Sequence, residues 1–425
     1  MKNTIYLILL MMLYFQCGKQ GNDVQLILTH EQNSLKYDST NPPVIIKDFS
    51  INKYNISDII KTITLIPLET NNDCLVGNIH KILATSEYFI LFDKSYEKAI
   101  YLFHRNGKFH TKISRRGKGP GEYILPTDIS INHYDKSLEL LDLAQRKIIK
   151  YTFDGIFCSE IYLEDLALPV SFINYDSGYL VSTQNFHIPN LGWTFFNLYE
   201  FSSKGDLKSN NFPNREHDKL FAVLNNDVLS PYGSSINYVA SWENMIYNID
   251  NNIIRPSFKF DFGNRGIPIS LIEEYRKIQF SNQEELSKIS FRMRDEINNS
   301  NYMYGPNLIC ETDEYIYISC QRGRDFFPVF YSKKTKKVFS SPAYNIDMWL
   351  CYALPYFLPV ATTEKGEFIG GMIPSKIIQQ FKDIKKEATK EQLEAIKEGY
   401  KDYISLIENI DEYDNPIISI IEFEF

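Results

Sequence analysis

A glycine-rich segment at residues 117–123 is the first candidate for chemistry, because glycine stands at positions 117, 119 and 121. Glycines let backbone N–H groups approach an anion closely, so such a segment can cradle a phosphate. Two neighbours argue against that use. Pro120 has no N–H group to donate, and residues 124–131 have the pattern of a strand, so no helix N-terminus follows. The context favours a tight loop that joins two strands.

Arginine and aromatic side chains make a second candidate. Arg322 and Arg324 stand close to Phe326 and Phe327, and a guanidinium fork beside aromatic rings can hold a carboxylate or stack on a sugar or peptide. Trp242 is a further candidate for stacking on a ligand. The alternative is structural: a solvated loop with one phenylalanine in the core, and a tryptophan buried between packed sheets.

Signatures of catalysis are missing from the sequence. It contains no H-E-x-x-H motif, no G-x-S-x-G nucleophile elbow and no G-x-x-x-x-G-K-[ST] phosphate loop. The seven histidines show no metal-ligand spacing. The sequence therefore favours a protein without enzymatic activity, and we expect no cofactor.

Composition favours strands and argues against a nucleic-acid partner. Aromatic residues make up 14% of the chain, with 29 Tyr and 29 Phe, and such side chains pack well on a pleated sheet. The formal net charge is −8, whereas binding to a phosphate backbone depends on clustered Lys and Arg. We expect an all-β protein that does not bind nucleic acid.

The N-terminus has the pattern of an export signal. Lys2 is followed by an uncharged apolar stretch, residues 5–15, that is too short to span a bilayer. Cys17 stands where a bacterial lipoprotein would be cleaved and lipidated; the alternative is ordinary cleavage nearby that removes it. We expect residues 1–17 to be the signal and residues 18–43 to be a polar, flexible tether. The folded part then lies in the periplasm or at the outer membrane, attached to the membrane only through lipid.

The other cysteines are scattered, and no C-x-x-C pair indicates a zinc or redox site. They are Cys74, Cys158, Cys310, Cys320 and Cys351. Cys310 and Cys320 flank an expected hairpin turn at residues 311–314, but their distances from that turn are unequal. Two free thiols are therefore favoured over a cross-strand disulfide.

A repeat of about 50 residues organises the chain from residue 44 onward, near the period of propeller repeats. Each unit has a strand that ends in a polar residue, a loop, a second strand and a tight turn. The first three turns carry Gly107, Gly155 and Gly205, and Asn-Gly and Asp-Gly pairs favour hairpins. Later units begin near residues 245, 315 and 368. Six such units predict six blades.

A first helical insertion is expected at about residues 267–300, between the fourth and fifth units. Ser270 can cap a helix over residues 271–279. Ser281 and Glu284 match the S-x-x-E capping box of a second helix that reaches about residue 297.

A second helical insertion is expected at about residues 375–410, within the sixth unit. Thr389 and Gln392 form a capping box, and apolar residues then recur at three- and four-residue spacing. We interpret this segment as a packing helix; a helix that binds a partner is the alternative.

The last strand, residues 416–425, is apolar and would leave an exposed edge unless it were paired. The early strand 63–68 is the natural partner, and its pairing would close a ring of blades. These two strands and the segment 117–123 resemble the six-bladed β-propeller lipoproteins of Bacteroidetes, which are related in shape to NHL and TolB-like propellers. The resemblance covers residues 44–425 and implies one six-bladed propeller with two helical insertions, carried in the cell envelope.

In such a propeller the segment 117–123 would connect two blades at one mouth of the channel, where loops on a rigid scaffold commonly build ligand sites. Arg115, Arg116, Glu122 and Tyr123 are therefore candidate ligand-binding residues. The alternative is that both arginines are solvated and Glu122 ties the loop to a neighbour.

The leading functional hypothesis is a monomeric, non-catalytic module that binds an envelope ligand, either a glycan, a peptide or another envelope protein. The alternative hypothesis is a metal-dependent hydrolase or lyase, because the lactonase-like six-bladed propellers hold calcium in their channel with Glu, Asn and Asp side chains. Asp128, Asn174 and Asn237 lie near expected starts of inner strands and would be the matching residues here.

Overall fold

The computed structural model of the chain describes residues 35–47, 49, 59–163, 169–183, 196–213, 228–240, 243–340, 359–363, 365–399 and 401–425. Cys17, Trp242 and Cys351 lie outside these ranges, as do the expected signal segment and most of the expected tether.

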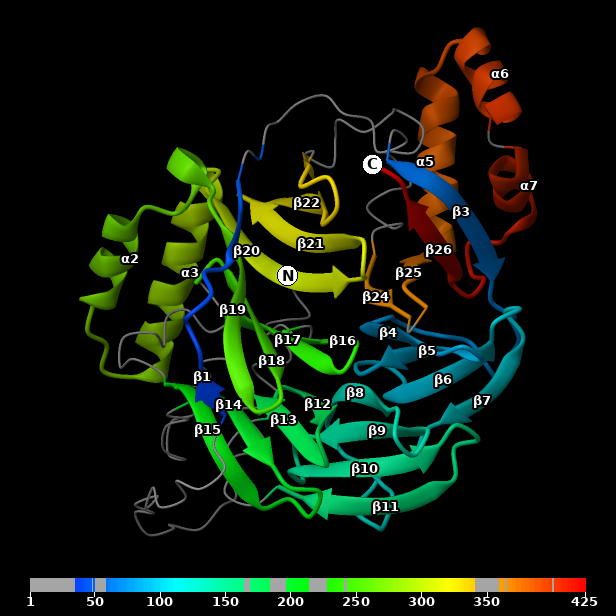
Figure 1. Cartoon of the computed structure of the whole chain (residues 1–425). Coiled ribbons are helices and arrows are strands. Elements are labelled where there is room, and N and C mark those ends of the chain that lie inside the picture. Colours follow the sequence, from blue (N-terminus) through cyan, green and yellow to red (C-terminus); the bar gives the residue numbers. More distant parts are fainter. Residues whose placement is uncertain are drawn as a thin grey trace. The chain divides into compact units, whose positions relative to one another are not determined.

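The chain folds as a six-bladed β-propeller, which confirms the predicted fold class (Figure 1). Each blade is built on four antiparallel strands. Blade 1 consists of β4 (Lys81–Ala84), β5 (Tyr88–Asp93), β6 (Ala99–His104) and β7 (Phe109–Ile113). Blade 2 consists of β8 (Pro126–Asn132), β9 (Ser137–Asp142), β10 (Lys147–Thr152) and β11 (Phe157–Tyr162). Blade 3 consists of β12 (Ser171–Tyr175), β13 (Gly178–Ser182), β14 (Phe196–Phe201) and β15 (Leu207–Pro213).

The remaining blades follow in the same strand order. Blade 4 consists of β16 (Leu229–Tyr232), β17 (Ser235–Ala240), β18 (Met245–Asp250) and β19 (Ile253–Phe260). Blade 5 consists of β20 (Met303–Glu311), β21 (Tyr315–Arg322), β22 (Asp325–Ser332) and β23 (Val338–Ser340). Blade 6 consists of β24 (Ala361–Thr362), β25 (Phe368–Met372), β26 (Ile417–Phe423) and the early strand β3 (Ile60–Pro67).

Blade 6 closes the ring, as predicted, by joining the two ends of the propeller sequence. Strand β3 pairs antiparallel with β26, with Pro67 opposite Ile417 and Ile60 opposite Phe423. The buried side chain of Asn415 adds to this closure: it accepts from the N–H of Val76 at 2.8 Å and donates to the carbonyls of Glu69 and Cys74. The apolar end of the chain is therefore a paired strand and not a free edge.

The first strands of the six blades, β4, β8, β12, β16, β20 and β24, are neighbours around the ring. We call the end at which each of them turns into the second strand of its blade the turn end. The opposite end, where the last strand of one blade leads to the next blade, is the connector end. Because strands in a blade alternate in direction, every residue of a loop can be assigned to one end from the strand order alone.

The aspartates that end the second strands of blades 1 and 2 fasten the connector end. The carboxylate of Asp93 accepts from the N–H of Asn78 at 3.2 Å. That of Asp142 accepts from the N–H groups of Ile124 and Leu125 at 2.9 and 3.0 Å. In these two blades the Asp that ends the second strand thus ties the incoming connector to the blade.

A short N-terminal segment adds two strands to blade 4. β1 (Lys36–Tyr37) and β2 (Val44–Ile46) both pair in parallel with β19. Residues 36–43 were expected to be tether, but the outer strand of a blade offers unpaired backbone groups that the segment satisfies.

The first helical insertion consists of α2 (Ile269–Arg276) and α3 (Gln283–Asn299). Two capping predictions were wrong here. Helix α2 begins after Pro268, whose fixed φ suits the helix start, so Ser270 lies inside the helix. Helix α3 is capped by Asn282, which accepts from the N–H of Glu285 at 2.9 Å, so the capping box lies one residue later than predicted.

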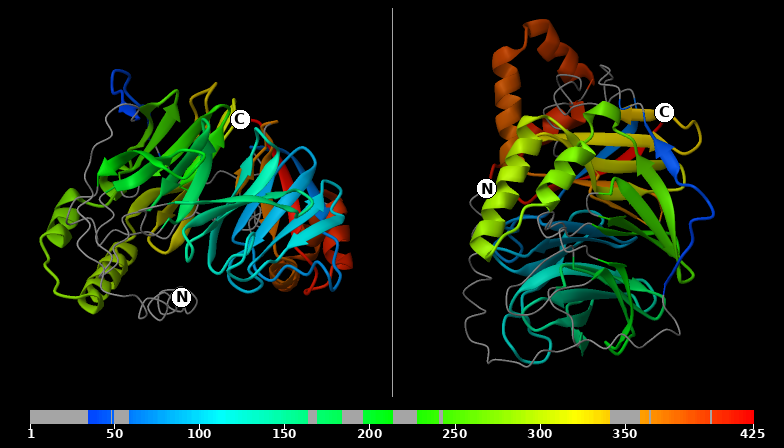
Figure 2. Two further views of the ribbon diagram at one scale, coloured as in Figure 1. Left: turned by 90° about the horizontal axis from the view of Figure 1, so that it is seen from below. Right: turned by 90° about the vertical axis from the view of Figure 1, so that its left-hand side faces the viewer.

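The second helical insertion is broken into α5 (Pro374–Glu387), α6 (Lys390–Gly399) and α7 (Lys401–Asn409). Its apolar side chains share one core with blades 5 and 6, including Ile377 and Ile404 with Phe330 and Ile421. Figure 2 shows these helices, in orange and red, beside the red strand β26. The interpretation as packing helices is confirmed.

Among the described residues, no helix is both long and apolar enough to cross a bilayer. The described cysteines Cys74, Cys158, Cys310 and Cys320 form no disulfide with one another. The prediction that Cys310 and Cys320 are not joined by a cross-strand disulfide is therefore confirmed.

Candidate functional site

The glycine-rich segment 117–123 is the connector from β7 to β8, as predicted. Its N–H groups are already used: Gly119 donates to the Glu122 carboxylate at 2.8 Å and Gly121 donates to Glu160 at 3.1 Å. Gly121 has φ +69°, and an added Cβ would lie 2.6 Å from a ring carbon of Phe157. The glycines therefore serve a compact turn against blade 2 and not a phosphate.

The predicted ligand-binding residues of this connector point into the protein or form hydrogen bonds with its backbone. Arg115 donates to the carbonyl of Gly155 at 3.3 Å, and Arg116 donates to the carbonyls of Tyr96 and Glu97. The Glu122 carboxylate accepts from the N–H of Gly119 in the same loop, whereas the structural alternative expected it to tie the loop to a neighbour.

Tyr123 is fully buried, and its hydroxyl lies 2.5 Å from the carbonyl oxygen of Lys98. Burial raises the pKa of Tyr123, so it is a neutral core side chain. Ligand binding by Arg115, Arg116 and Glu122 stays a prediction.

The second predicted cluster lies at the turn between β21 and β22, also at the connector end but in blade 5. Arg322 ends β21, and the exposed Arg324 pairs with Asp295 of α3 at 3.4 Å. Blade 5 is not adjacent to blades 1 and 2 in the ring, so the structure does not bring the two predicted clusters together. Trp242 lies outside the described residues.

A central cavity of about 860 Å³ lies in the described part of the propeller. All six inner strands line it, together with the turns at their ends, including residues 133–134, 233–234 and 312–314. These turns belong to the turn end. The cavity therefore opens on the side opposite to the clusters that the sequence singled out.

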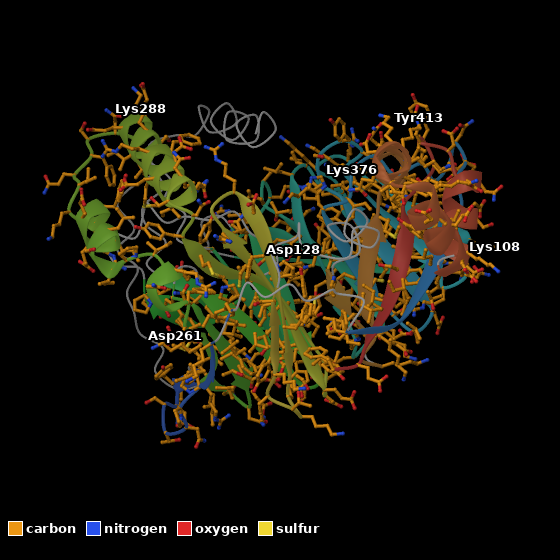
Figure 3. The ribbon with its side chains drawn as sticks, turned by 90° about the horizontal axis from the view of Figure 1, so that it is seen from above. Lys108, Asp128, Asp261, Lys288, Lys376 and Tyr413 are labelled. Atoms are coloured by element: carbon orange, nitrogen blue, oxygen red, sulfur yellow. The ribbon has the colours of Figure 1, made fainter. Side chains whose placement is uncertain are left out.

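An ion pair forms the floor of the central cavity. Lys81 of β4 lines the cavity and its ammonium nitrogen lies 2.7 Å from the carboxylate of Asp128 on β8. Asp128 is fully buried (Figure 3) and also accepts from the N–H groups of Phe172 and Ile129. Burial raises the pKa of Asp128, and the Lys81 ammonium and the two N–H groups oppose that shift. The pair joins three consecutive inner strands.

A second polar network forms the wall of the cavity in blades 4 and 5. Glu311 pairs with Lys333 at 2.7 Å and accepts from the side-chain amide of Asn237 at 2.5 Å. The Lys333 ammonium lies 4.0 Å from the ring centre of Tyr232, whose hydroxyl donates to Asp313 at 3.2 Å. This wall places the ring of Tyr232 and the carboxylate of Asp313 beside the cavity.

A second cavity of about 450 Å³ lies between blades 2 and 3, also at the turn end. Tyr134, Asn174 and Asp176 line both cavities, so the two spaces adjoin. Beneath it the fully buried carboxylate of Glu139 accepts from Asn174 at 2.6 Å and from Tyr179 at 3.1 Å. Burial and the Glu139 carboxylate raise the pKa of Tyr179.

Lys150 completes this network, with its ammonium 3.3 Å from Glu139 and paired also with Asp135. Burial lowers the pKa of Lys150, but these two carboxylates outweigh it and raise the pKa. The charged groups below the second cavity are therefore compensated by one another.

The residues matched to a calcium site are engaged elsewhere. Asp128 is bound to Lys81, Asn174 to Glu139, and Asn237 to Glu311. Within the described ranges, no group of three or more His, Cys, Asp or Glu side chains is arranged to hold a metal ion.

Sequence reasoning missed the turn-end residues. Tyr134, Asp176 and Ser234 lie in short polar turns of a kind that every repeat contains, so nothing local distinguishes them. The one available signal was their equivalent position in successive repeats, at the end of each inner strand.

The comparisons with known proteins agree with this fold. The sequence profile of a family described as "Domain of unknown function (DUF4934)" matches residues 45–422. A Bacteroides fragilis protein described as a candidate exported protein is similar in structure, with a TM-score of 0.69 and 18% identity over 90% of this chain and 100% of that chain. A DUF4221-family protein from Bacteroides vulgatus has a TM-score of 0.50 and 9% identity over 86% of this chain and 97% of that chain. No curated protein matches the sequence significantly.

Proposed function

The chain belongs to the DUF4934 family, and we propose that this member is a non-catalytic ligand-binding module of the cell envelope whose site is the central cavity. One observation carries the proposal: a cavity of about 860 Å³, within the usual size of ligand sites, is lined by all six inner strands. A ring of packed blades fixes the geometry of such a site before any ligand arrives.

The side chains of the cavity favour binding over catalysis. A general acid or base must reach the proton that it transfers, but the buried carboxylates of Asp128 and Glu311 are each committed to a lysine within 2.7 Å. The more exposed groups, such as Asp176, Asp313 and Ser234, stand on separate turns of the rim. They can orient a ligand by hydrogen bonds, but they do not form a nucleophile with an adjacent general base.

Location in the envelope rests on the N-terminal segment. The export signal and Cys17 lead us to expect a lipid-anchored protein in the periplasm or at the outer membrane. The structural similarity to a Bacteroides fragilis protein described as a candidate exported protein supports export.

A cavity-filling variant tests the proposed site. Ser234 lies in an exposed turn that lines the cavity, so Ser234→Trp places a large side chain in the opening without disturbing a strand. Ser405→Trp on the exposed face of α7 is the matched control. Binding of oligosaccharide and peptide probes is measured by calorimetry on the mature chain. We expect Ser234→Trp to weaken binding and Ser405→Trp to leave it unchanged.

Three results would overturn the proposal. They are the absence of binding by every probe, binding that Ser234→Trp leaves intact, and chemical conversion of a bound probe detected by mass spectrometry. Glu122→Ala and Arg322→Ala in the same assay test the connector-end prediction, because a loss of binding in either one would move the site to that end.

A further inference from the structure

The two adjoining cavities make one groove at the turn end, from the centre of the ring to the space between blades 2 and 3. Tyr134, Asn174 and Asp176 are the residues common to both parts. The central cavity, about 860 Å³, is by itself within the usual size of a small-molecule site, and the second cavity adds about 450 Å³ beside it. The groove suits a chain-like ligand that enters the central cavity at one end.

Tyr134 is an exposed aromatic residue at the junction. Its side chain is 81% exposed, and it lines both cavities. The backbone of its turn is held by Asn132, whose side-chain oxygen accepts from the N–H of Tyr134 at 3.1 Å and from that of Asp135 at 3.4 Å. A tyrosine has only two side-chain torsions, so it offers a flat apolar face to a ligand at little entropic cost.

Around this ring the groove offers hydrogen-bonding groups of both kinds. The buried side-chain oxygen of Asn174 has no hydrogen-bond partner in the described part of the chain, and Asp176, Ser177 and Ser203 supply a carboxylate and hydroxyls. An acceptor that is buried without a partner costs free energy, which a hydroxyl donor from a ligand would recover.

The charge of the groove argues against a polyanionic ligand. Asp135 and Glu139 are compensated by Lys150, and Asp176 adds an exposed negative charge. A phosphate-rich or sulfated chain would meet repulsion and no arginine. A peptide strand is also disfavoured between blades 2 and 3, because this part of the groove is lined by the faces of the two blades and not by an open strand edge.

We propose that this groove binds a neutral oligosaccharide, with one sugar ring stacked on Tyr134 and its hydroxyls bonded to Asn174 and Asp176. The inference rests on the proposed function and names the ligand class of the same site. Sugar rings combine an apolar face with hydroxyls that both donate and accept, which matches an exposed aromatic ring flanked by amide and carboxylate oxygens.

Calorimetry with defined oligosaccharides tests the proposal. The probes are the cello-, malto- and chito-oligosaccharide series from one to six units, added to the mature chain. We expect at least one series to bind with an affinity that rises with chain length, since only a chain can occupy both cavities. Tyr134→Ala should weaken it about tenfold, whereas Tyr134→Phe should retain it.

Tyr413→Ala is the matched control. Tyr413 is 78% exposed and its N–H donates to the side chain of Asp411 at 3.0 Å, so it resembles Tyr134 in exposure and turn type, but it precedes β26 at the connector end. We expect Tyr413→Ala to bind like the unchanged protein and both variants to melt at similar temperatures.

The possible failures are distinguishable. Binding of peptide probes that Ser234→Trp blocks, without any oligosaccharide binding, would overturn the oligosaccharide inference and leave the central site standing. Oligosaccharide binding that Ser234→Trp abolishes and Tyr134→Ala does not change would exclude the groove between blades 2 and 3. If neither class of probe binds, both proposals fall.

Discussion

The ion pair at the floor of the cavity allows a sharp test of how the site is built. Lys81 and Asp128 lie 2.7 Å apart, with side chains that are 13% and 0% exposed. Replacing Lys81 by Met keeps the shape of the side chain but leaves a buried carboxylate without its cation. Replacing Asp128 by Asn leaves the ammonium unpaired and keeps an acceptor for only one of the N–H groups of Ile129 and Phe172, which bond different oxygens of the carboxylate.

The expected magnitudes follow from burial. Removing one partner of a fully buried ion pair costs about 3–5 kcal/mol of unfolding free energy. Because Lys81 keeps some exposure toward the cavity, water can compensate part of the loss, and we expect each single variant to cost about 2–4 kcal/mol. The double variant Lys81→Met/Asp128→Asn leaves no unpaired charge and should cost less than either single change.

The pH dependence separates the two single variants. Burial raises the pKa of Asp128 in the folded chain above that in the unfolded chain. A carboxyl with a raised folded pKa binds its proton more readily when folded, so its protonation adds stability as the pH falls. In Lys81→Met the opposing effect of the ammonium is gone, and the pKa of Asp128 should rise further. The destabilisation should therefore shrink from pH 7 to pH 5, and Asp128→Asn should show no such recovery.

Urea denaturation at pH 7 and pH 5, followed by circular dichroism, measures all four proteins. A double variant that is as unstable as the sum of the single variants would show that the two side chains do not interact. Equal destabilisation of Lys81→Met at both pH values would refute the assigned state of Asp128. Either result would remove the ion pair from the description of the cavity floor.

Three further predictions concern the closure of the ring, the binding of calcium and the lipid anchor at Cys17. Asn415→Ala removes three hydrogen bonds made by a buried side chain at the ring closure and should lower the unfolding free energy by about 3 kcal/mol in urea, while Asn409→Ala at the exposed end of α7 should change it little. Calcium titration by calorimetry should show no stoichiometric site; a site of one ion per chain would support the hydrolase or lyase alternative. Expression in a Bacteroidetes host with labelled fatty acid should label the protein, and Cys17→Ala should abolish the label; an unlabelled parent protein would contradict lipidation.

The fold could be predicted because its information is local and repeated. Strand β9, residues 137–142, is buried along its whole length, and its three leucines mark it in the sequence as a strand packed between neighbouring blades. The Gly107 and Gly155 turns gave the period, and the unpaired apolar strand at the chain end implied closure with the early strand. Each of these features depends on a few neighbouring residues or on an apolar strand whose edge must be paired.

The features that sequence reasoning missed depend on competition between neighbouring capping residues or on partners that are far away in the sequence. At α3, Ser281 and Asn282 are both good caps, and only the position of Glu285 in the folded turn decides between them. The strand β1 pairs with β19, more than 200 residues away, and its own sequence is polar. Asp128 looked like a ligand for calcium because its partner Lys81 belongs to a different blade.

The positions of the insertions explain why the two ends of the ring differ. Helices α2 and α3 emerge between the last strand of blade 4 and the first strand of blade 5, and α5 to α7 emerge between the second and third strands of blade 6. Both places are at the connector end. In the described part of the chain the turns at the other end are short, so neither helical insertion lies at the opening of the central cavity.

This asymmetry bears on how a ligand arrives. At the connector end the arginines and glutamate of the segment 114–123 are bonded to neighbouring backbone, which stabilises the blades but leaves fewer groups for a partner. At the turn end Tyr134 and Asp176 remain exposed beside a cavity. A ligand that binds the exposed turn-end groups displaces only water, whereas a ligand at the connector end must also break existing protein contacts. Binding therefore gains more free energy at the turn end.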